Sequence, residues 1–144
     1  MAKPYQVAAL PIRRSNSGAV EVLLVTSRET RRWVVPKGWP WRKVKNHDAA
    51  AGEAWEEAGV RGLANPKSIG SFTYDKRRKT GVRALKVHVY LLEVTEEAAV
   101  WPEQQQRQRN WFSLATAAGL VAEAELKDLL LALDQTAVSD ADRR

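Results

Sequence analysis

One segment, residues 46–58, constrains the fold of this chain more than any other. Its apolar residues recur with the spacing of one helical face: Ala51, Ala54, Trp55 and Ala58. Asn46 is suited to the N-cap position, and Gly59 to the position that ends a helix. We expect Trp55, on the apolar face, to lie in the core. The segment therefore predicts one helix, with strands before and after it.

Runs of β-branched and apolar residues on both sides of this helix alternate with turn residues. They predict strands at residues 5–14, 20–27, 33–35, 68–74, 82–94 and 110–112. The first two strands are expected to pair as a hairpin, and a basic turn at residues 75–81 separates the fourth strand from the fifth.

Helical periodicity returns at residues 113–120 and 124–133, whereas residues 138–144 are polar and are expected to fray. No linker or repeat divides the chain. Residues 1–144 are therefore expected to form a single α+β domain, an α/β/α sandwich in which helices pack on a mixed β-sheet.

The predicted helix carries three carboxylates, at Glu53, Glu56 and Glu57. The first and last form a like-charge pair four residues apart, and two of the three occupy the last turn, where the helix dipole disfavours negative charge. A solvated acidic face is one interpretation. The alternative is that the three carboxylates are held close together despite their repulsion because they bind a metal ion. A hard divalent cation, Mg²⁺ or Mn²⁺, is favoured, because such ions prefer oxygen ligands.

Composition narrows the possible chemistry. The chain has no cysteine, which excludes a disulfide scaffold, a thiolate zinc site and a cysteine nucleophile. It has 23 lysine and arginine residues against 17 acidic ones, an excess that favours anionic partners. No apolar run is long enough to span a membrane, and residues 1–6 lack the apolar region of a leader, so we expect a cytoplasmic protein with no membrane partner.

The segment from the loop before the helix to its end resembles the signature of the Nudix hydrolase family. The matching residues are Gly38, Glu53, Ala54, Glu56, Glu57, Gly59 and Val60. Residues 32–38 resemble the strand and Pro-Lys-Gly entry of family members, and residues 101–103 and 109–112 resemble the C-terminal part of the diphosphoinositol polyphosphate phosphohydrolase branch. The resemblance covers roughly residues 5–133, and it implies a Nudix fold with a catalytic loop-helix-loop and C-terminal helices.

The resemblance also implies a metal site and a reaction. The carboxylates of Glu53 and Glu57 and the carbonyl of Gly38 correspond to metal ligands, and Glu56 to a ligand or to the base that activates water. Glu56 and Glu57 are thus the candidate catalytic residues, and which of them is the base stays open. Glu96, Glu97 and Glu103 are further candidate bases, although each is expected to be a solvated loop acid.

Two signature positions depart from the family pattern. Val44 stands where the family has a glutamate, and Gly52 where it has an arginine. In the family these residues help to orient the metal-binding carboxylates. Loss of one member of this charge pair would leave the other charge buried and unpaired. Loss of both leaves no unpaired charge, so the two changes are consistent with each other. They put the orientation of the ligands in question.

Basic residues near the signature predict a polyphosphate-rich substrate, such as a diphosphoinositol polyphosphate or a diadenosine polyphosphate. The candidate binding residues are Arg28, Arg32, Lys37, Arg78 and Arg109. A solubilising role is an equal interpretation for the basic turn. Trp39 and Trp41 are interpreted as packing residues, with purine stacking as the alternative.

Two other functions remain open at this stage. The chain could hydrolyse the 5′ pyrophosphate of RNA, or it could be a Nudix module that binds a nucleotide without turning it over. A monomer and a homodimer fit the sequence equally.

Overall fold

A mixed β-sheet forms the centre of the computed structural model, which describes residues 4–142, without the side chains of residues 77–78 and 137–142. Within that range lie eight strands and three helices. The first half contains β1 (Tyr5–Arg14), β2 (Val20–Thr26), β3 (Trp33–Val34), β4 (Lys37–Gly38), α1 (Asn46–Ala58) and β5 (Val60–Ala64). The second half contains β6 (Gly70–Arg78), β7 (Gly81–Glu97), β8 (Arg109–Ser113), α2 (Leu114–Leu120) and α3 (Ala124–Asp142).

The two central strands, β1 and β7, run parallel, and the pairs β1–β2, β6–β7, β5–β7 and β2–β8 are antiparallel. Strand β1 is buried from Gln6 to Pro11, as expected for a strand covered on both faces. Successive side chains of β1 point to opposite faces of the sheet and pack in two different hydrophobic clusters. Ala8 and Leu10 face the cluster formed with α2 and α3, whereas Val7 and Ala9 face the cluster formed with α1.

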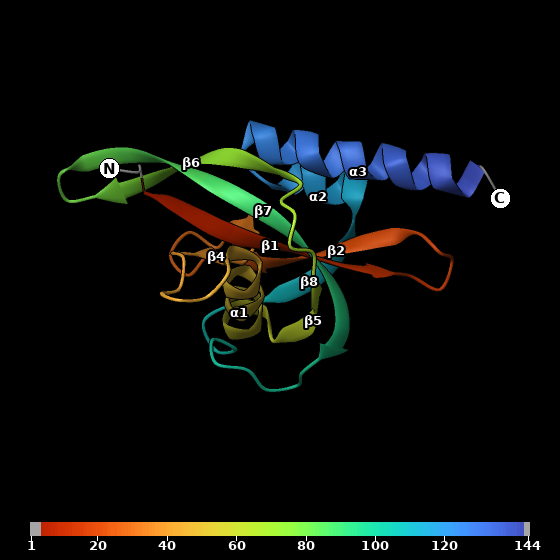
Figure 1. The fold of residues 1–144 in the computed structure, drawn as a ribbon, viewed down its shortest axis with the longest axis horizontal. Coiled ribbons are helices and arrows are strands. Elements are labelled where there is room, and N and C mark those ends of the chain that lie inside the picture. The colour runs from red at the N-terminus through yellow and green to blue at the C-terminus, as the bar shows by residue number, and fades with distance from the viewer. Residues whose placement is uncertain (1–3, 143–144) are drawn as a thin grey trace.

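Helix α1 therefore covers one face of the sheet, and α2 and α3 cover the other (Figure 1). This arrangement confirms the predicted mixed sheet and the α/β/α layers. No helix within residues 4–142 is both long enough and apolar enough to cross a membrane.

Several element boundaries differ from the prediction. Strands β6 and β7 continue through most of the basic segment expected to be a turn. Helix α3 continues to Asp142, because no glycine or proline follows Leu133 to end it, so most of residues 138–144 are helical and only 143–144 lie outside the described residues. Strand β5 was not predicted. It is short, and Gly62 marks an irregularity where a side chain would overlap the carbonyl oxygen of Glu93.

The start and the exposed face of α1 also differ from the prediction. Lys45, not Asn46, occupies the N-cap position, and the Asn46 amide donates instead to the Tyr5 hydroxyl (3.1 Å). Trp55 is only partly buried, and its ring packs against the guanidinium of Arg61 at 3.7 Å. The expected core position of Trp55 was therefore wrong, because the face of α1 that packs on the sheet is centred on Ala50, Ala54 and Ala58.

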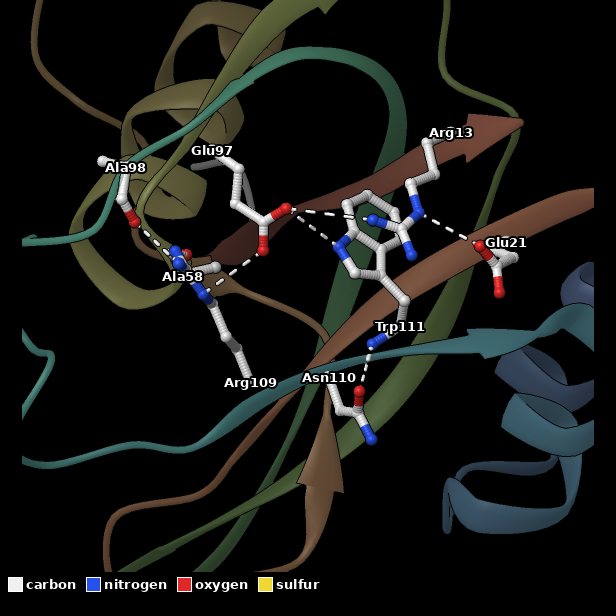
Figure 2. Close-up of polar contacts among 8 residues, drawn as sticks. All are labelled: Arg13, Glu21, Ala58, Glu97, Ala98, Arg109, Asn110 and Trp111. Atoms are coloured by element: carbon white, nitrogen blue, oxygen red, sulfur yellow. Dashed lines mark hydrogen bonds and ion pairs between the residues drawn. The ribbon is translucent and has the colours of Figure 1, made fainter. Parts of the chain in front are cut away.

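The C-terminal end of α1 is held by residues distant in sequence. Gly59 ends the helix in the left-handed conformation (φ 69°). The Arg109 guanidinium donates to the carbonyl oxygens of Ala58 (2.8 Å) and Ala98 (2.6 Å), as Figure 2 shows. It also stacks on the Trp101 ring at 3.8 Å, and the Trp101 indole donates to the carbonyl oxygen of Glu57 (3.1 Å). The last turn of α1 has no basic residue of its own, so Arg109 supplies the positive charge there.

Replacing Arg109 with Met should lower the free energy of unfolding by about 2–4 kcal/mol, because two buried carbonyl groups lose a charged donor. Urea denaturation would measure the loss. Arg13→Met is the matched control, since Arg13 pairs with Glu21 and Glu97 at an exposed site (Figure 2) and should cost about 1 kcal/mol or less. Equal losses in the two variants would contradict this structural role of Arg109.

Candidate active site

A cavity of about 1070 Å³ opens beside the C-terminal half of α1 and the loop that follows β4. Its wall includes residues from β1, β4, α1, β6 and the loops at residues 27–32 and 103–107. The cavity brings together six of the residues predicted from the sequence: Arg28, Arg32, Lys37, Gly38, Glu53 and Glu57.

Two neighbouring carboxylates line the cavity. Glu57 is only 6% exposed, and Glu53, one turn earlier on α1, is half-buried. The pKa of Glu57 is raised to about 8, mainly by burial; Arg107 and Lys37 oppose this rise, and the nearby Glu53 and Glu103 contribute to it. Burial also raises the pKa of Glu53, against a hydrogen bond that its Oε1 accepts from the Trp41 indole (3.0 Å). The acidic face is therefore not a solvated one at these two positions.

Gly38 brings the β4 backbone against the Glu53 side chain. A Cβ atom built on Gly38 would overlap the Glu53 carboxylate, with Oε2 only 2.6 Å away. Since β4 pairs with β1 through Val7 and Gly38, the sheet fixes the backbone that the carboxylate contacts. A glycine is needed here for close approach.

Arg107 and Glu103 also line the cavity, although neither was among the candidate metal-binding or substrate-binding residues predicted from the sequence. Arg107 lies with its Nε 2.8 Å from Glu103 Oε1 and its Nη2 3.7 Å from Glu57 Oε1, and its Nη1 donates to the carbonyl oxygen of Thr26 (3.1 Å). Glu103, predicted to be a solvated loop acid, instead lines the cavity in a close ion pair. Arg107 thus fixes two acidic side chains to β2, which ties the loop to the sheet.

The basic side of the cavity carries Arg28, Arg32, Lys37 and Lys76. Burial lowers the pKa of Lys37, opposed by the carboxylates of Glu57 and Glu123. The Lys37 ammonium lies 4.0 Å from the centre of the Tyr74 ring. Acidic and basic groups therefore meet in one cavity, which suits a ligand that carries several negative charges beside a cation.

Two of the predicted site residues whose side chains the structure describes, Glu56 and Arg109, do not line the cavity. The main-chain carbonyl oxygen of Glu56 accepts a hydrogen bond from the Glu103 amide (3.0 Å). Arg109 holds the end of α1, and both of its terminal nitrogens donate to main-chain carbonyls. The prediction for the Arg78 side chain falls outside the described residues, although its backbone pairs with Gly81.

Whether a divalent ion fits can be judged from the donor set. Within residues 4–142 no group of three acidic, histidine or cysteine side chains converges on one point. Glu53 and Glu57 nevertheless form a desolvated pair of oxygen donors, and burial is the main cause that raises the pKa of each. A hard cation between them would stabilise their ionised forms, so the donor chemistry fits Mg²⁺ or Mn²⁺.

Comparison with known families and proteins gives consistent matches. The model of the NUDIX domain matches residues 3–132. Nudix hydrolase 21, chloroplastic, of Arabidopsis thaliana is 32% identical over 127 residues, which are 86% of this chain and 63% of that protein. Diphosphoinositol polyphosphate phosphohydrolase 3-beta of Homo sapiens is 37% identical over 100 residues, 67% of this chain and 57% of that protein. The chain thus spans between about half and two thirds of these relatives.

Solved structures show the same fold. A Caenorhabditis elegans Ap4A hydrolase in a binary complex superimposes with a TM-score of 0.69 at 20% identity, covering 95% of this chain and 99% of that one. A NUDIX hydrolase from Nitrosomonas europaea gives a TM-score of 0.67 at 15% identity, with 90% and 86% covered. These likenesses confirm the predicted fold.

The raised pKa of Glu57 predicts how stability depends on pH. Folding raises this pKa from 4.5 to about 8, so the stability that the protonated group contributes is present below pH 4.5 and is lost as pH rises toward 8. Glu53 acts in the same direction. Measured with a chelator present, the free energy of unfolding should fall by on the order of 3–5 kcal/mol across this window.

Glu57→Gln is the control for this dependence, because the amide keeps the shape of the side chain and cannot ionise. Chemical denaturation from pH 5 to pH 8 should show a much flatter profile for this variant. A native profile that is already flat, or one that Glu57→Gln leaves unchanged, would contradict the shift.

Proposed function

Because the chain belongs to the NUDIX domain family, as its signature predicted, and resembles proteins named as hydrolases, we propose that it is a magnesium-dependent pyrophosphohydrolase. Family members generally use divalent metal ions. On this proposal the substrates are polyphosphate-rich anions, either diphosphoinositol polyphosphates or diadenosine polyphosphates. The first class is in the name of a human relative and the second in that of a solved structure with this fold.

One observation carries the proposal: the paired carboxylates Glu53 and Glu57 face the same cavity as Arg28, Arg32 and Lys37. Cleavage of a phosphoanhydride requires neutralisation of charge on the phosphoryl oxygens and a water that loses a proton. An acidic group and a basic group in one cavity meet these two needs. An isolated acidic patch or an isolated basic patch would meet only one of them.

The metal ion would be held by the carboxylates of Glu53 and Glu57 and the carbonyl of Gly38, with Glu56 completing the set that the family resemblance implies. When bound, it would supply charge neutralisation at the phosphoryl oxygens. Glu57 is the better placed of the two candidate bases, because its side chain lines the cavity. Glu56 remains the alternative base.

The basic residues have separate tasks on this proposal. Arg28 and Arg32 offer planar donor groups near the mouth, suited to the terminal phosphates of a long anion. Lys37 lies deeper and close to Glu57, where an ammonium group can bind the phosphoryl group under attack. Arg107 fixes the positions of the Glu57 and Glu103 carboxylates through an ion pair with each.

The test is phosphate release with Mg²⁺ from a panel of diphosphoinositol polyphosphates, diadenosine polyphosphates, nucleotide sugars and triphosphorylated or capped RNA. We expect turnover of the polyphosphate-rich compounds, and a fall in kcat of on the order of 100-fold or more in Glu57→Gln. Preference for RNA would select the pyrophosphohydrolase of RNA ends instead. Binding without release from any compound would select the non-catalytic module.

Charge removal at the cavity mouth tests how the substrate is recognised. The double variant Arg28→Ala/Arg32→Ala should raise KM for a polyphosphate substrate roughly tenfold or more, since two charge-assisted contacts are lost. Arg14→Ala, in the β1–β2 hairpin and outside the cavity, is the matched control and should leave KM unchanged. An unchanged KM in the double variant would remove these two residues from the binding site.

A further inference from the structure

Gly52 lies in the middle of α1, where glycine is a poor choice for helix stability. Its backbone is ordinary helix, so no unusual torsion calls for glycine there. The reason is a close contact instead. A Cβ atom on Gly52 would overlap the ring of Trp41, with indole Cζ2 only 2.7 Å away. The indole therefore rests directly on the helix backbone, in space that any larger residue would fill.

The contact with Gly52 orients the polar edge of the same indole toward the active site. Trp41 Nε1 donates to Glu53 Oε1 at 3.0 Å, and Glu53 is the residue next to Gly52. On its other side the Glu53 carboxylate contacts the backbone at Gly38. The carboxylate is thus held between one fixed hydrogen-bond donor and one fixed stretch of strand.

Trp41 is itself held by the backbone of its loop. The Val44 amide donates to the Trp41 carbonyl oxygen (3.2 Å), and Lys43 takes the left-handed conformation (φ 61°) that closes this turn. The turn brings residue 41 back against α1. Trp41 is still 38% exposed, which leaves one side of the ring on the cavity wall.

These contacts coincide with the two departures from the family signature, Val44 and Gly52. We propose that Trp41 is a positioning residue for Glu53, and that Trp41 and Gly52 together orient this carboxylate where the family uses a glutamate and an arginine at positions 44 and 52. The proposal rests on the function proposed above, because it concerns the same metal-binding carboxylate.

Binding of Mn²⁺ alone, measured by calorimetry on the whole chain, tests the proposal. Trp41→Phe keeps an aromatic ring and removes the N–H donor, and it should raise the Kd for Mn²⁺ roughly tenfold, as loss of a hydrogen-bonding partner of a ligand does. Trp111→Phe is the matched control. The Trp111 indole also donates to a carboxylate, that of Glu97 (3.2 Å), but away from the cavity, so the Kd should not change.

Gly52→Ala tests whether the two residues act as one unit. Its methyl group should displace the indole and raise the Kd for Mn²⁺ as much as Trp41→Phe does, although alanine favours the helix. The double variant Trp41→Phe/Gly52→Ala should then bind Mn²⁺ no more weakly than either single variant. Thermal denaturation of each variant verifies that it is folded.

The kinetic constants separate positioning from substrate stacking. Positioning predicts a lower kcat on every substrate of the panel, with KM little changed. Stacking of Trp41 on a purine predicts a higher KM for adenine compounds only, with native Mn²⁺ affinity, and that result would overturn the proposal. So would native Mn²⁺ affinity in Trp41→Phe, or fully additive losses in the double variant. Failure of the native chain itself to bind Mn²⁺ would instead contradict the proposed function.

Discussion

The burial of an acidic side chain, Glu57, is the constraint on which the rest of the structure depends. An ionised carboxylate with little access to water is unstable unless positive charge or hydrogen bonds compensate for the lost hydration. Arg107 and Lys37 compensate for only part of this loss, and the pKa of Glu57 stays high. Even with Arg107 beside it, Glu57 is more easily protonated than a solvated glutamate, and further positive charge in the cavity would stabilise its ionised form.

Residues from much of the chain also converge on one helix, the one that carries Glu57. Helix α1 is short of its own stabilising features: it has no side-chain cap at its start, no basic residue in its last turn, and a glycine at its centre. Its contacts with the rest of the molecule replace them. Ala50, Ala54 and Ala58 pack on the sheet, and Trp101 and Arg109 bind its terminal carbonyls. Packing thus determines where the carboxylates stand.

Local sequence patterns were enough to predict the sheet, the main helix and most of the acidic site. Alternating and continuous apolar runs identify β1, β2 and β7, and helical spacing with Gly59 identifies the extent of α1. The burial of Glu57 could have been read from its position three residues after Ala54, on the edge of the packed face. The glycine at position 52 was likewise a sign of close packing against α1. The resemblance to the family showed it only as the loss of an arginine.

Other features depend on contacts that no local pattern encodes. Glu103 looks like a solvated loop acid because no residue near it in sequence is buried, and only the return of its loop to α1 and β2 pairs it with Arg107. Arg109 was predicted to bind the substrate, yet it contacts the Glu97 carboxylate and donates to main-chain carbonyls 51 and 11 residues away. Main-chain acceptors leave no trace in the sequence.

The anchoring of α1 by Trp101 and Arg109 has a consequence for the order in which the molecule assembles. These contacts span 44 and 51 residues, so the segment that bears the carboxylates is made long before its anchors leave the ribosome. Until then the end of the helix lacks both the Arg109 guanidinium and the Trp101 indole, and these contacts do not yet offset the repulsion between the acidic residues. The contacts that hold the last turn of α1 can therefore form only after residues 101–109 have been made.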